Sequence, residues 1–318
     1  MSVHAFIFPG QGSQTVGMGR DLAAAHAAAR EVFEEIDETL KQKLSKLMFE
    51  GPGEDLILTE NTQPALLAHS LAVLRVLETE GNFRLADRAV VVAGHSLGEY
   101  SALAAAGTFT PAQAAALLRV RGRAMQSAVR PGDGAMAALL GAEMALAQEI
   151  CAEAAEGPDG LQVVQPANDN GGGQVVISGH REAVERAIEV AKSKGVRRAM
   201  LLPVSAPFHC ALMAPAAQVL AAALERMPPN SPLVPLIANV SAAKATDPDE
   251  IARLLVEQVT ATVRWRESVI AMTELGINSF IELGAGKVLS GLVRRIAPDV
   301  ATASVGTPAE IEQLLKLL

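Results

Sequence analysis

A serine flanked by glycines, between a short apolar segment and an alanine-rich one, is the feature that most constrains this chain. Residues 89–93 are valine-rich and are predicted to form a buried strand, and a helix is predicted to reach residue 106. Gly94-His95-Ser96-Leu97-Gly98 lies between them and matches G-x-S-x-G, a pattern that places a serine on a sharp strand-to-helix turn. Bulky flanking residues would collide there. The pattern indicates an α/β unit with Ser96 as a candidate nucleophile.

Strands and helices alternate along most of the chain. Strands are predicted at residues 3–8, 89–93, 234–237, 279–283 and 300–304. Helices are predicted at residues 21–40, 64–80, 111–129, 212–226, 249–258 and 265–275, with two more near the end of the chain. Thr62 is positioned to cap the helix in which Pro64 lies near the first turn. This alternation predicts a mainly parallel sheet with helices on both faces.

The middle of the chain follows a different order. Strands are predicted at residues 135–140, 161–165, 174–178 and 197–204, with helices at residues 143–156 and around residues 184–191. This is the β-α-β-β-α-β order of ferredoxin-like units. We therefore predict a small ferredoxin-like subdomain of residues 131–203, inserted into a large α/β core made of residues 1–130 and 204–318.

Composition excludes several classes of function. The net charge of -8 and the pI near 5.4 argue against broad binding to nucleic acid or to anionic membranes. Cys151 and Cys210 cannot form a disulfide framework and have no metal-ligand spacing around them, so we expect a reducing compartment and no metal. No segment is apolar enough over a sufficient length to span a bilayer. We expect a cytoplasmic protein.

A serine hydroxyl needs a base, usually histidine, to act as a nucleophile at neutral pH. His209 follows the end of a predicted strand, where α/β enzymes place functional loops. His95 adjoins Ser96, but neighbouring side chains on a tight turn point apart. The remaining histidines lie in predicted strand, helix or cap positions and are expected to be structural or exposed: His4, His26, His69 and His180.

No acidic residue is placed to complete a triad. The best acid in a loop between Ser96 and His209 is Asp169, which lies inside the predicted insert. We therefore expect a Ser-His dyad whose imidazole is oriented by a backbone carbonyl.

Three arginines lie two residues apart on the helix predicted after Pro111. Side chains at that spacing point to different faces, so at most one of Arg119, Arg121 and Arg123 is expected to face a cleft while the others meet solvent. A buried arginine there would offer a bidentate partner for a carboxylate on an acyl group. On the residues alone, three solvated charges are the favoured alternative.

Several sequence blocks, in this order, resemble the malonyl-coenzyme A:acyl carrier protein transacylases of bacterial fatty-acid synthesis. The blocks are Phe8-Pro9-Gly10-Gln11-Gly12-Ser13-Gln14, Gln63-Pro64-Ala65, Gly94-His95-Ser96-Leu97-Gly98-Glu99-Tyr100, Arg121-Gly122-Arg123-Ala124-Met125-Gln126, Gln174-Val175-Val176-Ile177-Ser178-Gly179, Phe208-His209-Cys210-Ala211-Leu212-Met213 and Glu282-Leu283-Gly284-Ala285-Gly286-Lys287-Val288-Leu289. The resemblance covers essentially the whole chain. It implies a hydrolase-like α/β core with a ferredoxin-like insert.

The resemblance also implies roles for individual residues. Ser96 would be the nucleophile and His209 the base, the backbone amides of Gln11 and Leu97 would form the oxyanion hole, and Arg121 would grip the free malonyl carboxylate.

Further residues of the same blocks are expected around the substrate. The carbonyl of Arg264 would help to orient the histidine, and Phe208 favours malonyl over methylmalonyl because a bulky residue before the base leaves little room for an α-methyl group. Gln63 and His95 are expected to contact substrate.

The implied reaction moves a malonyl group from malonyl-coenzyme A to the phosphopantetheine thiol of an acyl carrier protein, through a malonyl-serine intermediate and without a cofactor. A monomer is expected. Two other classes stay open, a plain serine hydrolase such as a thioesterase and a non-catalytic carrier-binding module. A polyketide pathway is an alternative to fatty-acid synthesis.

Carrier proteins are typically acidic, so docking on this acidic chain needs a local basic patch. The candidates are Lys192, Lys194, Arg197 and Arg198 in the predicted insert, and Arg294 and Arg295 on a late helix. An ordinary solvated surface is the alternative explanation for both clusters.

Overall fold

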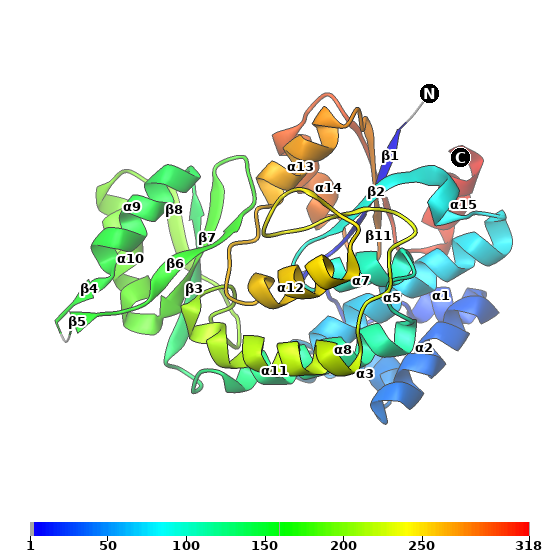
Figure 1. The fold of residues 1–318 in the computed structure, drawn as a ribbon, viewed down its shortest axis with the longest axis horizontal. Helices are drawn as coiled ribbons and strands as arrows, with labels where there is room; N and C mark the ends of the chain where they lie inside the picture. Colours follow the sequence, from blue (N-terminus) through cyan, green and yellow to red (C-terminus); the bar gives the residue numbers. More distant parts are fainter. Residues whose placement is uncertain (1–2, 159, 318) are drawn as a thin grey trace.

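The computed structural model describes residues 3–158 and 160–317. Its centre is a six-stranded sheet with the strand order β10-β9-β2-β1-β11-β12 (Figure 1). The strands are β1 (His4–Phe8), β2 (Ala89–Gly94), β9 (Leu236–Ile237), β10 (Lys244–Ala245), β11 (Ser279–Leu283) and β12 (Ala301–Val305). Neighbours are parallel except β9 and β10, which are antiparallel. The mixed α/β class and the mainly parallel sheet are confirmed.

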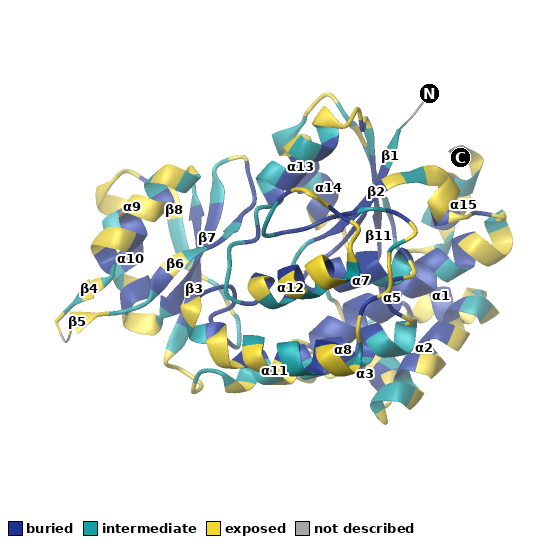
Figure 2. Ribbon diagram, viewed as in Figure 1, coloured by how far each residue is buried: buried dark blue, intermediate teal, exposed yellow. Residues whose placement is uncertain are grey.

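Helices cover both faces of this sheet, because alternate residues of its buried strands point to opposite sides. Phe6 and Phe8 of β1 join a large cluster with one group of helices, whereas Ala5 and Ile7 join a second cluster with the other. The first group includes α1 (Arg20–Ala25), α2 (Ala27–Leu40), α5 (Thr59–Gly81), α7 (Gly98–Ala105), α8 (Pro111–Ser127), α11 (Ala214–Arg226), α12 (Pro248–Gln258) and α15 (Pro308–Leu317). The second contains α13 (Trp265–Glu274) and α14 (Val288–Ile296). Figure 2 shows the exposed residues of these helices facing outward.

Several helix boundaries differ from the predictions. The helix predicted from Pro64 begins at Thr59, and Thr62 is not its cap, since its hydroxyl lies inside the helix and donates to the Leu56 carbonyl at 2.6 Å. The helix predicted over residues 21–40 is interrupted at His26, whose backbone is extended. Three short helices were not predicted: α3 (Leu44–Glu50), α4 (Gly53–Leu56) and α6 (Leu85–Arg88).

A second, antiparallel sheet has the strand order β6-β7-β3-β8. It is built from β3 (Gly134–Leu140), α9 (Met144–Ala154), β6 (Val164–Asp169), β7 (Gln174–His180), α10 (Arg181–Ser193) and β8 (Arg198–Leu201). The β-α-β-β-α-β element order is therefore observed. The strand predicted at residues 161–165 begins later, because Gly160 and Leu161 form the short hairpin strand β5 with β4 (Glu156–Gly157).

The small sheet has its own apolar cluster and contacts the core through β3, β6 and β7. Leu139, Ile177 and Val184 belong to a cluster separate from the two clusters of the large sheet. β6 reaches the core where Asp169 N–H donates to the Val263 carbonyl at 2.9 Å. Figure 1 shows this sheet, with α9 and α10, at one end of the molecule. Within the described residues, no helix has the length and apolar character needed to cross a bilayer.

Candidate active site

Ser96 lies on a strained turn between β2 and α7. Its φ is 54°, in the left-handed region that non-glycine residues rarely occupy. The two flanking glycines make this turn possible, since a Cβ on Gly94 would collide with the Gly98 carbonyl, and a Cβ on Gly98 would collide with the Phe8 carbonyl. The amide of Ser96 donates to Asn239 Oδ1 at 2.8 Å. The turn therefore fixes the serine at the carboxyl end of a central strand.

His209 is bound to Ser96 on one side and to a backbone carbonyl on the other. Its Nε2 lies 2.7 Å from Ser96 Oγ, and its Nδ1 lies 2.8 Å from the carbonyl oxygen of Gln258. Because a carbonyl only accepts, Nδ1 carries the proton and Nε2 is free to accept one from the serine. Burial, followed by the charge of Arg121, lowers the pKa of His209 to about 3. The imidazole is therefore neutral at physiological pH.

Arg121 points to the same serine hydroxyl from α8. It is 2% exposed, and its Nη2 donates to Ser96 Oγ at 3.1 Å and to Gln258 Oε1 at 2.9 Å. Its Nη1 donates to Gln63 Oε1 at 2.7 Å. No carboxylate of the described residues lies within 4.0 Å of this guanidinium. A buried cation held by neutral partners beside a nucleophile is suited to bind an acyl group that carries its own carboxylate.

The neighbouring arginines on α8 differ from each other. Arg123 is exposed and donates to Glu60 at 2.8 Å, as expected. Arg119 was expected to meet solvent, but it is 8% exposed and donates to Gln42 Oε1. The prediction failed for Arg119 because α2 and the start of α5 pack over that face of the helix.

The backbone amides of Gln11 and Leu97 were predicted to form the oxyanion hole. Leu97 directly precedes α7, so its N–H is among the free donors of a helix N-terminus. The side chain of Gln11 is fixed by Thr59, whose hydroxyl donates to Gln11 Oε1 at 2.9 Å. In the described part of the chain, neither amide donates to another protein group.

Known proteins resemble this chain over its whole length. The acyl transferase domain family model matches residues 5–307. The malonyl CoA-acyl carrier protein transacylase of Escherichia coli K12 is 46% identical over 317 residues, which cover 100% of both chains. The structure of an acyl-carrier-protein-S-malonyltransferase from Bartonella henselae is 55% identical and superposes with a TM-score of 0.95 over 99% of each chain. The chain belongs to the malonyl CoA-acyl carrier protein transacylase family of acyltransferases.

A further structure of this family contains a carrier protein. It is a malonyl-transacylase in complex with a type II polyketide synthase acyl-carrier protein, 42% identical with a TM-score of 0.95 over 100% of each chain. Within the described residues of this acyltransferase, no group of three or more His, Cys, Asp and Glu side chains could hold a metal ion.

Arg264 does not orient the histidine. Its carbonyl accepts from both the amide and the hydroxyl of Ser268, at 2.9 and 2.8 Å, at the start of α13. The carbonyl that accepts from His209 is that of Gln258, the last residue of α12. The predicted mode of orientation, through a backbone carbonyl, agrees with the structure, and the residue predicted for it was wrong.

The other predicted substrate contacts are placed around the dyad. Gln63 is 1% exposed and accepts from Arg121, so it holds the guanidinium in place. Phe208 is 8% exposed and packs in the main apolar cluster directly before the base. His95 turns away from Ser96, because its Nε2 lies 2.9 Å from Asn170 Oδ1 and its ring lies 5.7 Å from that of Trp265. Asp169 is bound to Arg266 at 2.9 Å and takes no part in the dyad.

Three buried polar residues that contact the Ser96 turn were not predicted as site residues. Gln258 donates through Nε2 to the Ser96 carbonyl at 3.0 Å, Asn239 donates through Nδ2 to the Gly94 carbonyl at 2.7 Å, and Glu99 accepts from both of them. Together they surround the turn. Glu99 stood in a recognised sequence block, and Gln258 ended a predicted helix, but neither position indicates a contact with Ser96.

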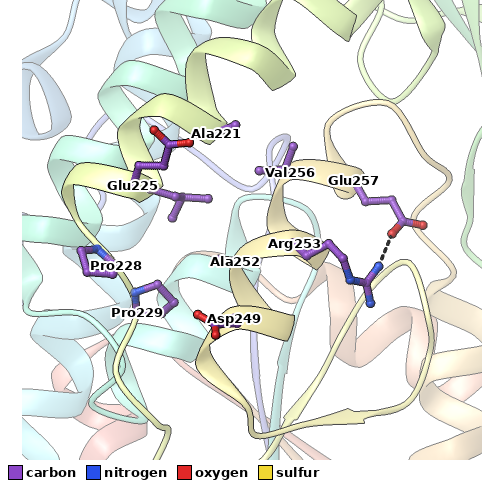
Figure 3. Close-up of a pocket in the computed structure, with 10 residues that line it drawn as sticks. Ala221, Glu225, Pro228, Pro229, Asp249, Ala252, Arg253, Val256 and Glu257 are labelled. Carbon is purple, nitrogen blue, oxygen red and sulfur yellow. Dashed lines mark hydrogen bonds and ion pairs between the residues drawn. The ribbon is translucent and has the colours of Figure 1, made fainter.

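A surface groove of about 510 Å³ lies between α11 and α12, apart from the dyad (Figure 3). Its lining residues are Ala221, Leu224, Glu225, Pro228, Pro229, Asp249, Ala252, Arg253, Val256 and Glu257. At its rim Arg253 donates to Glu257 at 3.0 Å. None of these residues is a predicted site residue, and Ser96, His209 and Arg121 do not line the groove.

Proposed function

We propose that this acyltransferase moves a malonyl group from malonyl-coenzyme A to the phosphopantetheine thiol of an acyl carrier protein and so supplies fatty-acid synthesis. One observation carries the proposal. Ser96 Oγ lies 2.7 Å from a neutral base, His209, and 3.1 Å from the buried guanidinium of Arg121. A nucleophile, a base and a carboxylate-binding cation thus converge on one atom. The names of the relatives agree with this substrate and this acceptor.

In the first half-reaction, Ser96 Oγ attacks the thioester carbonyl while His209 Nε2 takes its proton. The carbonyl oxygen becomes an oxyanion, which the amides of Gln11 and Leu97 stabilise. The tetrahedral intermediate collapses when the C–S bond breaks. His209 then returns the proton to the departing coenzyme A thiolate, and the malonyl group remains on Ser96 as an ester.

In the second half-reaction, the carrier thiol takes the place of coenzyme A. His209 removes the thiol proton, the sulfur attacks the ester carbonyl, and the proton passes to Ser96 as its C–O bond breaks. Both thiols use one site in turn, so the kinetics are ping-pong. Each step balances without a cofactor or a metal.

The substrate class follows from Arg121 and Phe208. The malonyl carboxylate would replace the contact of Arg121 with Ser96 Oγ and form a charge-assisted pair. The bulk of Phe208 disfavours an α-methyl substituent.

We further propose that the protein is a cytoplasmic monomer with a hydrolase-like core of residues 1–130 and 204–318. Residues 131–203 form a ferredoxin-like subdomain in this proposal, since the strand order β6-β7-β3-β8 is that of a ferredoxin-like unit.

Intact-protein mass tests the proposal directly. After mixing with malonyl-coenzyme A, the protein should gain the mass of one malonyl group, and peptide mapping should place it on Ser96. Added carrier protein should then remove the adduct and become malonylated. If free malonate dominates while carrier is present, the chain is a serine hydrolase, and if no adduct forms, it is a carrier-binding module.

Replacing Arg121 with alanine should change the acyl preference. A malonyl carboxylate left without its partner in a buried site should lower kcat/KM for malonyl transfer. The corresponding loss of transition-state stabilisation is about 2 to 4 kcal/mol, whereas acetyl transfer should stay level or rise. The ratio of kcat/KM for malonyl over acetyl is the measurement. Arg123→Ala, an exposed arginine on the same helix, is the control. A ratio that Arg121→Ala leaves unchanged would contradict the role of Arg121.

Basic clusters are the proposed docking sites for the carrier. Lys192 and Lys194 already pair with Glu189 and Glu153, at 2.6 and 3.1 Å, so the exposed Arg197 and Arg198 are the stronger candidates in the small subdomain. The second candidate pair on α14 is Arg294 and Arg295, which are also exposed.

Charge reversal distinguishes these clusters from ordinary surface. Arg197→Glu with Arg198→Glu, or Arg294→Glu with Arg295→Glu, should raise KM for the carrier by about tenfold, since each lost contact with an acidic partner costs on the order of 1 kcal/mol or less. KM for malonyl-coenzyme A should not change. Lys46→Glu on α3 is the control. If neither pair alters KM for the carrier, both clusters are solvated surface.

A further inference from the structure

A buried acidic residue, Glu99, lies three residues after the nucleophile, Ser96. Glu99 of α7 is 1% exposed, and no Lys or Arg of the described chain lies within 4.0 Å of its carboxyl group. Its partners are neutral: the Asn239 amide donates to Oε1 at 3.3 Å, and Gln258 Nε2 donates to Oε2. The mechanism proposed above does not use this carboxyl group.

One amide connects Glu99 to the arginine. The Nε2 of Gln258 faces Glu99, and its Oε1 accepts from Arg121 Nη2 at 2.9 Å. The carboxyl group and the guanidinium are therefore on the two sides of a single buried side chain. When a malonyl carboxylate binds to Arg121, two carboxyl groups share the field of one cation among buried side chains. Two carboxylates in that arrangement repel each other, and one of them must take up a proton.

Burial raises the pKa of Glu99 to about 8, against the smaller opposing effects of its amide partners and of Arg121. The other titratable groups around it do not change charge in that range. Burial lowers the pKa of His209 to about 3 and also lowers that of His95, while burial raises the pKa of Tyr100 above its ordinary value. Arg121 stays charged.

We propose that Glu99 is a positioning residue that must be uncharged for Arg121 to accept the malonyl carboxylate, so that malonyl binding is coupled to one proton on Glu99. This inference rests on the proposed function. The neutral carboxyl group still accepts hydrogen bonds, so Gln258 keeps its orientation and Arg121 keeps its place. Ionised Glu99 instead neutralises Arg121 and weakens its hold on the substrate.

The sign of the pH dependence follows from the proton. Below the pKa of Glu99 the proton is already bound, and malonyl binding releases or takes up none. Above that pKa the proton must come from solvent, so malonyl affinity falls as pH rises. Acetyl-coenzyme A has no acyl carboxylate, and its affinity should not depend on Glu99.

Steady-state kinetics across this range provide the test. For the unmodified protein, KM for malonyl-coenzyme A should rise about tenfold between about pH 7 and about pH 9, as expected for one group with a pKa of about 8. KM for acetyl-coenzyme A should stay level. Glu99→Gln, which cannot ionise, should remove the rise. Glu282→Gln is the matched control, because Glu282 is also buried with a raised pKa but binds the amides of Leu289 and Ser290.

A second measurement covers the case in which Glu99→Gln does not fold. Ser96→Ala should bind malonyl-coenzyme A without transfer, and calorimetry in two buffers of different ionisation enthalpy should detect about three quarters of a proton taken up at about pH 8.5. Acetyl-coenzyme A should cause no uptake. A flat KM in the unmodified protein, an equal rise in Glu99→Gln, or binding without proton uptake would overturn the inference. The malonyl adduct on Ser96 tests the proposed function independently, since it forms or fails whatever the pH dependence.

Discussion

Ser96→Ala should form no malonyl adduct and should lose transfer by about 10⁶-fold, the scale seen when a serine protease loses its nucleophile. His209 Nε2 and Arg121 Nη2 both converge on Ser96 Oγ, and the turn holds the Ser96 backbone at a φ of 54°. Intact mass after exposure to malonyl-coenzyme A and the single-turnover rate of transfer to carrier measure the two effects.

Ser101→Ala provides the control for this experiment. Ser101 lies on α7, the helix that follows the Ser96 turn, is fully buried and has a hydroxyl without a partner among the described residues. Its loss should leave both the adduct and the rate close to those of the unmodified protein. An adduct that persists in Ser96→Ala, or a rate that falls equally in both variants, would show that the nucleophile is a different group.

The large sheet could be predicted because its signals are local. The strands β1 and β11 are short apolar segments buried on both faces, and β11 was predicted with its observed bounds, Ser279–Leu283. Pro111 marked the start of α8, where the structure has a full capping box of Thr110 and Gln113. The short helices α3 and α4 were not predicted, since a helix of one or two turns depends on tertiary packing more than on its own periodicity.

The candidate site was predicted only in part, and the division follows sequence distance. G-x-S-x-G marks Ser96 within five residues, whereas Asn239 and Gln258 reach that serine across 143 and 162 positions. No local pattern indicates such contacts. The same limit explains Arg264, because the carbonyl that faces His209 belongs to Gln258, at the end of α12 and 49 positions away along the chain. Arg119 was misjudged in the same way, since its burial depends on a neighbouring helix.

His209→Ala should slow both half-reactions by about 10² to 10⁴-fold, the contribution of a positioned general base. The same imidazole takes the proton of Ser96 during acylation and that of the carrier thiol during deacylation, so the two rates should fall together.

Because the pKa of His209 is lowered to about 3, the neutral imidazole persists in acid. Acylation by the unmodified protein should therefore stay level as pH falls from about 7 to about 5, where an ordinary histidine would lose its activity as a base. His26→Ala is the control, since His26 binds Glu80 at 2.5 Å far along the chain from the dyad. If only one half-reaction slows, two different bases serve the two thiols, and the carbonyl of Gln258 orients a base for only one of them.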